Sequence, residues 1–131
     1  MSTETADYNE VVMDHFANPR NVGDLPGANA VGTVTNPVCG DMMKLYLRIE
    51  DGTIRAARFK TYGCGAAIAA SSMATTLLIG RTLGGARELT KEFITEALGG
   101  LPERKIHCSV LAEDALDAAL KDFEKRRAAG A

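Results

Sequence analysis

Three cysteines are the residues of this sequence best suited to chemistry, and each lies where one structural element is expected to meet another. Cys39 lies in a turn directly before a glycine, Cys64 lies between two glycines ahead of an expected helix, and Cys108 lies at the start of another helix. The unpaired N–H groups and positive dipole end of a helix favour the thiolate, which is the form that binds metals and attacks sulfur. Glycine tolerates positive φ and lets backbone N–H groups approach a bound sulfur or metal closely. We therefore expect reactive or metal-binding thiols at these positions.

Two further donor side chains accompany these cysteines: Asp41 follows Cys39 by two residues, and His107 directly precedes Cys108. Soft thiolates select zinc, copper(I) or iron–sulfur clusters, and a single carboxylate with a single imidazole is too few for a calcium or magnesium cage. Three thiolates with Asp41 or His107 would complete either a four-coordinate zinc site or the four protein positions of a [2Fe-2S] cluster. The spacing does not distinguish these sites. A permanent electron-transfer cluster ordinarily uses four cysteines, or two with two histidines, so an oxygen donor in the set suggests a cluster that is released.

Structural roles are the competing interpretation of each residue. Free cysteine is among the most buried residue types, an aspartate such as Asp41 after a glycine commonly caps a turn, and adjacency to Cys108 does not require that His107 face the same ion. Three cysteines in glycine-rich boundary motifs nevertheless favour a site over three inert core residues. For His15, which lies on the first expected helix with no cysteine nearby, we favour a packing or surface role.

The composition indicates one folded domain over residues 1–131, with a flexible N-terminus over 1–6 and a frayed C-terminus over 126–131. The chain has 131 residues, of which 46% are hydrophobic and 24% charged, enough for a packed core. A net charge of -2 gives no basic field for nucleic acid, and no stretch approaches the ~20 apolar residues that span a membrane. The polar start lacks the order of a signal peptide, and three cysteines without a C-x-x-C pair do not suggest a disulfide framework. We therefore expect a cytoplasmic protein.

Hydrophobic periodicity predicts strands in the first half of the chain and helices in the second. The expected elements are a short helix capped by Asp7 and Glu10, strands over 30–35, 43–50 and 53–60, and helices over 65–80, 90–98 and from 108 onward. Period-two alternation after Met43 and the turn Asp51-Gly52 predict antiparallel pairing, with a bulge near Ala56-Ala57. The fold class is therefore α+β: a three-stranded antiparallel sheet with helices packed mainly on one face.

Several separated motifs extend the pattern beyond the cysteines. In chain order they are the segment from Tyr8 to Phe16 with Asn18-Pro19-Arg20-Asn21, then NPVCGDMMK, TYGCGAAIAASSM and HCSVLAEDAL. Together they closely resemble the IscU/NifU-type iron–sulfur cluster assembly scaffold family, and the resemblance runs from about Tyr8 to Leu120. Several motifs in the right order are a much stronger signal than any one C-G-D or G-C-G triplet.

This resemblance implies a scaffold without turnover of its own. Such a scaffold receives sulfur as persulfide from a cysteine desulfurase, receives Fe²⁺, assembles a labile [2Fe-2S] cluster and passes it to carrier or acceptor apoproteins. The resemblance places Cys39, Asp41, Cys64, His107 and Cys108 at the cluster and metal site. Cys108 would be the main persulfide acceptor, Asp41 the carboxylate that keeps the cluster labile, and His107 a ligand that can replace it. Zn²⁺ could occupy the cluster-free site, and a homo-oligomer around a shared cluster stays an open alternative.

One departure from the family and one rival function narrow this interpretation. The chaperone-binding Leu-Pro-Pro-Val-Lys stretch of the family appears here as Leu101-Pro102-Glu103-Arg104-Lys105, which leaves an Hsp70-type chaperone open as a partner. The rival function is a zinc-site protein, either a structural zinc module or a zinc-dependent sulfur acceptor (sulfurtransferase). We favour the scaffold because His107 precedes Cys108 and because structural zinc sites usually carry close C-x-x-C knuckles, which this sequence lacks.

Overall fold

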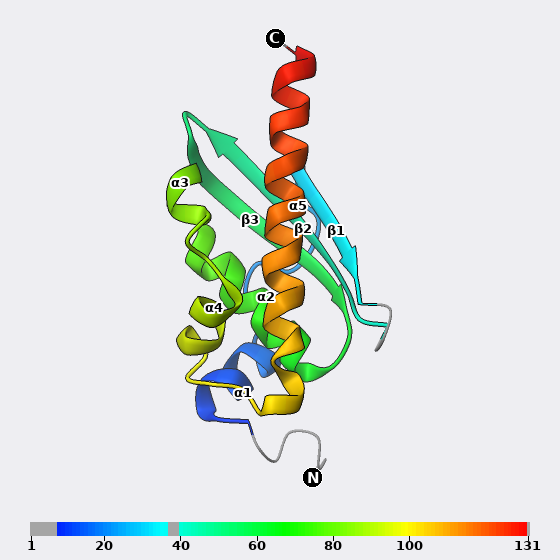
Figure 1. Cartoon of the computed structure of the whole chain (residues 1–131), viewed down its shortest axis with the longest axis vertical. Helices are drawn as coiled ribbons and strands as arrows, with labels where there is room; N and C mark the ends of the chain where they lie inside the picture. The colour runs from blue at the N-terminus through cyan, green and yellow to red at the C-terminus, as the bar shows by residue number, and fades with distance from the viewer. Residues whose placement is uncertain (1–7, 37–39, 131) are drawn as a thin grey trace.

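The computed structural model describes residues 8–36 and 40–130, and a three-stranded antiparallel sheet forms one layer of the molecule (Figure 1). The strands β1 (Ala30–Thr35), β2 (Met42–Glu50) and β3 (Thr53–Tyr62) lie in the order β1-β2-β3. Asp51 and Gly52 have φ angles of 52° and 72° in the turn between β2 and β3, the left-handed conformation that a two-residue hairpin requires. The predicted fold class is confirmed.

One face of the sheet forms the floor of the hydrophobic core. Alternate residues of β2 are buried on this face, namely Met43, Leu45, Leu47 and Ile49. Because side chains alternate between the two faces of a strand, these residues all point toward the same layer of helices. The predicted period-two pattern therefore identifies the core face.

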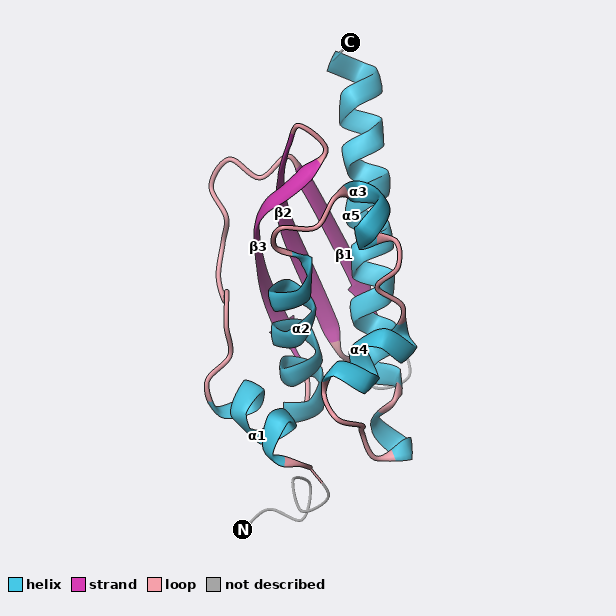
Figure 2. Cartoon of the chain, turned by 90° about the vertical axis from the view of Figure 1, so that its left-hand side faces the viewer, coloured by secondary structure: helices cyan, strands magenta, loops and turns pink. Residues whose placement is uncertain are grey.

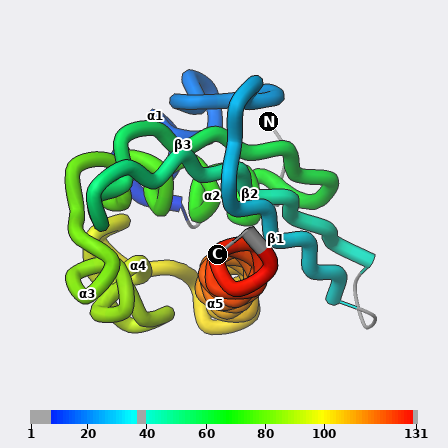
Figure 3. The backbone as a smooth tube through the Cα atoms, turned by 90° about the horizontal axis from the view of Figure 1, so that it is seen from above, coloured from blue at the N-terminus to red at the C-terminus, as the bar shows by residue number. Residues whose placement is uncertain are grey.

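Two helices, α2 (Gly65–Leu78) and α5 (His107–Gly130), cover this face (Figures 1 and 2). The view along the long axis shows the strands as one layer, with α5, α3 (Leu83–Ala86) and α4 (Lys91–Ala97) on the same side (Figure 3). Helix α1 (Glu10–Ala17) packs against α2. The covered face and the two long helices enclose the core.

Small residues let α5 lie unusually close to β1. A Cβ added at Gly32 would lie 2.4 Å from both the carbonyl oxygen of Ala115 and the backbone nitrogen of Ala119. No side chain fits in that space, because real Cβ atoms do not come within 3.0 Å of backbone atoms. The contact fixes how α5 is placed over the sheet, and hence where its N-terminus lies.

The boundaries differ from expectation at several points. The predicted capping pair is wrong: Asn9 caps α1 and accepts a hydrogen bond from the backbone N–H of Val12 at 2.9 Å. Asn9 takes this role because it directly precedes the first helical residue with an extended backbone, whereas Asp7 lies outside the described residues.

The bulge is confirmed one position earlier, at Arg55, since Ala56 pairs with Arg48 and the next pair is Ile54 with Ile49. The C-terminus, which we expected to fray over 126–131, is helical through residue 130 as part of α5.

The outer edge of β3 is covered by the segment that leads from α1 to β1. Phe59 donates its backbone N–H to the carbonyl of Asn21, and Gly23 donates its N–H to the carbonyl of Phe59, both at 2.9 Å. These hydrogen bonds occupy backbone N–H and carbonyl groups of the edge strand that would otherwise be open to pairing with another chain. Within the described parts of the chain, no helix has the length and apolar character needed to cross a membrane.

Candidate metal centre

Two sulfur atoms form the centre of the site: Cys64 Sγ and Cys108 Sγ lie 3.7 Å apart. Cys64 directly precedes α2, and Cys108 is the second residue of α5, so packing of these two helices brings the thiols together. Both thiols are free. Two sulfurs bound to one tetrahedral ion at about 2.3 Å each are separated by about 3.8 Å. The pair is therefore spaced to share one metal ion.

An imidazole and a carboxylate complete a set of donors around Cys108. His107 Nε2 lies 3.7 Å from Cys108 Sγ, and one ligand atom each from Asp41, His107 and Cys108 lie within 4.8 Å of one another. Thiolate, imidazole and carboxylate are the ligands used for zinc and, in varied combinations, for iron. The structure thus brings together four of the predicted site residues. Cys39 lies outside the described residues, so its role as a ligand stays a prediction.

Asp41 reaches the site because it continues the core face of β2 by one position. It lies two residues before Met43, which is buried on that face, and its own side chain is 8% exposed. Its carbonyl accepts a hydrogen bond from the backbone N–H of Asn36 at 2.8 Å, which holds the segment that leads into β2. The strand therefore carries the carboxylate beneath the N-terminus of α5, where Cys108 lies.

The two thiols polarise each other in opposite directions. The hydrogen bond from Cys108 is the main cause that lowers the pKa of Cys64 to about 5, although burial opposes it. Backbone N–H groups in the first turn of α2 and the charge of Lys105 lower the pKa of Cys64 further, even though its thiol closes no capping hydrogen bond. The same hydrogen bond, then burial, then the negative charges of Cys64 and Asp41 raise the pKa of Cys108. The hydrogen bond therefore favours the proton on Cys108 and negative charge on Cys64.

The donors lie near the surface and differ in exposure. Cys108 is 1% exposed, whereas Cys64 and His107 are half-buried. A cavity of about 210 Å³ opens beside His107, between the end of β1 and the start of α5. Tyr62, two residues before Cys64, is largely exposed. The site is therefore open to solvent at Cys64 and His107 and is not sealed inside the core.

The glycines on either side of Cys64 serve a purpose different from the one expected. Neither Gly63 nor Gly65 has a positive φ, so backbone freedom is not the reason for them. A Cβ at Gly65 would lie 3.1 Å from the ring of Phe16, and a Cβ at Gly63 would lie 2.8 Å from Asp41 Cγ. These glycines instead make room for a neighbouring side chain.

His15 has the packing role that we favoured. Its side chain is 7% exposed, and its Nδ1 lies 2.7 Å from Ser72 Oγ, which also accepts the backbone N–H of Arg20 at 2.9 Å. Burial, followed by the charge of Arg20, lowers the pKa of His15. The bonds join α1 and the segment after it to α2. Nothing in the local sequence identified Ser72, because the contact depends on how the helices pack.

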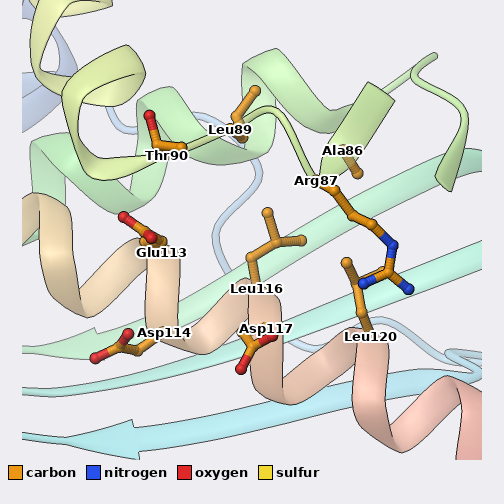
Figure 4. Close-up of a pocket in the computed structure, with 9 residues that line it drawn as sticks. All are labelled: Ala86, Arg87, Leu89, Thr90, Glu113, Asp114, Leu116, Asp117 and Leu120. Atoms are coloured by element: carbon orange, nitrogen blue, oxygen red, sulfur yellow. The ribbon is translucent and has the colours of Figure 1, made fainter. Parts of the chain in front are cut away.

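A second concave site, of about 300 Å³, lies between α5 and the segment from Ala86 to Thr90 (Figure 4). Its carboxylates are Glu113, Asp114 and Asp117. Glu113 accepts the backbone N–H of Lys91 at the start of α4, and Asp117 pairs with Lys121 at 2.9 Å. None of the described residues that line it is a cysteine or histidine. The site therefore offers no soft ligand, and the candidate metal centre is the one at the thiols.

Comparison with known proteins agrees with this geometry. The family model described as the NifU-like N terminal domain matches residues 7–130. The iron-sulfur cluster assembly scaffold protein IscU 1 of Archaeoglobus fulgidus is 51% identical over 119 residues, which cover 91% of this chain and 78% of that protein. The iron-sulfur cluster assembly scaffold protein IscU of Escherichia coli K12 is 48% identical over 126 residues, which cover 93% of this chain and 98% of that protein.

A solved structure has the same fold. The N-terminal NifU-like protein of Brucella abortus matches with a TM-score of 0.69 at 23% identity, over 89% of this chain and 94% of that one. The family model spans nearly the whole chain, and the two relatives named above are each about half identical to it. The chain therefore belongs to the NifU-like N-terminal domain family, of the IscU/NifU type.

Proposed function

We propose that this protein is a scaffold on which a labile [2Fe-2S] cluster is built and then passed to carrier or acceptor apoproteins. The observation that carries the proposal is the convergence of two thiols, one imidazole and one carboxylate from three separate segments of the chain. The relatives from Archaeoglobus fulgidus and Escherichia coli are both named as iron-sulfur cluster assembly scaffold proteins. The thiols must stay reduced to work, which fits a cytoplasmic protein.

Sulfur enters as the persulfide of a cysteine desulfurase. The Cys108 sulfur attacks the terminal sulfur of that persulfide, a new S–S bond forms on Cys108, and the S–S bond to the desulfurase breaks to release its cysteine as a thiolate. The proton of Cys108 passes to the Cys64 thiolate 3.7 Å away, which conserves charge. Each transferred sulfur then takes two electrons from a separate electron-transfer protein to become sulfide. The scaffold itself does not turn over.

Asp41 makes the cluster releasable. A carboxylate oxygen is a harder and weaker ligand for a cluster iron than a thiolate, so one corner of the cluster is held less firmly than the others. His107 lies within reach of the same position and can replace Asp41 as the ligand. The cluster is therefore cargo, held by Cys39, Cys64 and Cys108 and by one exchangeable donor.

A zinc-bound form is the second candidate, and one observation favours it. Ligand atoms of Asp41, His107 and Cys108 lie within 4.8 Å of one another, and Cys64 Sγ lies 3.7 Å from Cys108 Sγ, so these residues offer the ligand types and the number of ligands of a zinc site. We therefore propose Zn²⁺ as an occupant of the cluster-free protein. The rival function that follows is a zinc-dependent sulfur acceptor or a structural zinc module that never holds iron.

Anaerobic reconstitution separates the two functions. The protein is incubated with Fe²⁺, cysteine and a cysteine desulfurase, and its visible absorption, iron and acid-labile sulfide are measured. The scaffold should develop sulfur-to-iron charge-transfer bands with iron and sulfide in equal amounts, and an apoprotein acceptor should then take up the cluster. The Cys64→Ser variant serves as the control and should form little cluster. A colourless protein that retains one zinc ion under these conditions would overturn the scaffold function.

A further inference from the structure

One contact next to the thiols involves a residue that is not itself a donor: the backbone of Gly63 lies against the carboxylate of Asp41. A Cβ added at Gly63 would lie 2.8 Å from Asp41 Cγ and 3.0 Å from each carboxylate oxygen. Real Cβ atoms essentially never come this close to another heavy atom. The Asp41 carboxylate therefore occupies the space that a side chain at position 63 would need.

The strand register explains why these two residues meet. Met42 pairs with Tyr62 at the last step of the β2–β3 ladder, and the next step of the same antiparallel register places Asp41 opposite Gly63. Directly opposite residues project their side chains to the same face, where their Cβ atoms lie about 4.5–5.5 Å apart. On the core face this pair stands beside Cys108, and only one of the two side chains has room there.

Backbone conformation does not account for the glycine. Gly63 is absent from the described residues with positive φ, whereas Gly40 and Gly52 have φ angles of 75° and 72°. Any L-residue can adopt the backbone of Gly63, so the missing side chain is the property that matters there.

We propose that Gly63 is a positioning residue for the Asp41 carboxylate. Its lack of a side chain leaves the space from which Asp41 reaches the metal centre. The inference rests on the proposed function only in taking Asp41 as a ligand. A methyl group at position 63 turns the carboxylate away from Cys108 and leaves the thiols and the imidazole as the donors.

The clash should be relieved without unfolding. Asp41 has a short side chain, and a change of its χ1 rotamer moves all three clashing atoms together. The backbone at Gly63 needs no new conformation. Gly63→Ala should therefore fold and bind metal as though the Asp41 ligand were absent.

A double-mutant cycle with Co²⁺ tests this step. Co²⁺ reports thiolate ligation through its visible absorption, and its affinity is measured in the wild type, Gly63→Ala, Asp41→Ala and the double variant. Removal of a group that orients a ligand typically weakens metal binding about 10- to 100-fold. We expect Gly63→Ala and Asp41→Ala each to weaken Co²⁺ binding by a similar factor within that range, and Gly63→Ala to add no further loss in the Asp41→Ala background.

Gly84→Ala is the matched control, because a Cβ there has no atom within 4 Å and the residue has no positive φ. It should bind Co²⁺ like the wild type. Urea unfolding of the metal-free variants confirms that each is folded before its affinity is compared.

The possible outcomes separate the two proposals. Wild-type affinity in Gly63→Ala with weakened binding in Asp41→Ala would overturn the role of Gly63 and leave the scaffold function intact. An equal loss from Gly63→Ala in both backgrounds would show a general structural role and overturn it too. Unchanged binding in Asp41→Ala would remove Asp41 as a ligand and with it the positioning role. A coupled loss of Co²⁺ binding in a protein that never assembles a cluster would support the positioning role of Gly63 and overturn the scaffold function.

Discussion

Cys64 Sγ lies 3.7 Å from Cys108 Sγ, although 44 positions separate the two residues in the sequence. Each thiol belongs to the first turn of a helix or to the residue before it, and α2 and α5 pack side by side on the sheet. The pair therefore exists only in the folded protein. Its first chemical consequence is an unequal sharing of one proton, with the pKa of Cys64 lowered and that of Cys108 raised.

Cys64 should react as a thiolate in the metal-free protein. Its pKa of about 5 means that iodoacetamide should alkylate it already at about pH 6 to 7. Cys108→Ala removes the largest cause of that low pKa, so the midpoint of the alkylation profile of Cys64 should move to higher pH. Peptide mapping by mass spectrometry identifies the alkylated residue and distinguishes alkylation of Cys64 from alkylation of Cys39. In Cys108→Ser a hydroxyl donor remains and the shift should be smaller; an unchanged midpoint in both variants contradicts the shared proton.

Asp41→Ala should yield a cluster that persists longer and transfers more slowly, because the weak oxygen ligand is lost and His107 can take its place. We expect cluster transfer to an apoprotein to slow about tenfold or more, the scale of changes made next to a metal. The decay of visible absorption and the colour gained by the acceptor measure the two rates. Asp117→Ala is the control, since it removes only an exposed i,i+4 ion pair. Transfer at the wild-type rate would show that Asp41 does not govern release.

Cys108→Ser should lose most persulfide loading from a desulfurase. Serine keeps the size of the side chain and its hydrogen bonding, but its oxygen cannot form the S–S bond. Intact-mass measurement of the added sulfur gives the loading, and peptide mapping gives its position. Cys64→Ser should retain loading on Cys108. If the sulfur moves undiminished to Cys64, which is the more exposed and more acidic thiol, Cys108 is not the acceptor.

The sequence predicted the elements wherever the signal was local. Alternation after Met43 identified the core face of β2, and Thr90 caps α4 by accepting the backbone N–H of Phe93 at 3.2 Å. Helix α3 was missed because its four residues include two glycines, which are poor helix formers. It is held from outside, since Leu83 donates its backbone N–H to the carbonyl of Gly52.

The motifs singled out the candidate donors, but they did not indicate the contacts that support them. Residue types and flanking glycines singled out Cys64, Cys108 and His107 before any coordinates. The reason for Gly63 is a carboxylate on a different strand, and no local pattern reveals a cross-strand neighbour. Long-range packing is therefore the part of the site that sequence reasoning did not reach.

Gly32→Ala should destabilise the protein. Its Cβ would lie 2.4 Å from two backbone atoms of α5, which cannot turn away as a side chain can. Overpacking of this kind typically costs about 1–3 kcal/mol. Urea unfolding of the metal-free protein should show the lower free energy, and Gly84→Ala, which meets open space, should not. Equal stability of the two variants would mean that α5 can move away from β1 freely.

Stability should depend on pH through His15. Burial lowers the pKa of His15 from its ordinary value of 6.5, so the folded protein keeps the ring neutral at a pH where the unfolded chain takes up a proton. The unfolded state then binds more protons, and stability rises with pH in that range. The contribution of His15 to the stability of the folded protein is complete above about pH 6.5 and is lost as the pH falls below that value.

His15→Gln isolates this contribution, because glutamine keeps a polar group near Ser72 Oγ but does not titrate. With a chelator present, the urea midpoint of the wild type should fall more between about pH 7.5 and about pH 5.5 than that of His15→Gln. Other titrating groups are common to both proteins, so they cancel in the difference. Parallel profiles would mean that the ring accepts its proton inside the folded protein, and the contact with Ser72 would then have to tolerate a charged imidazole.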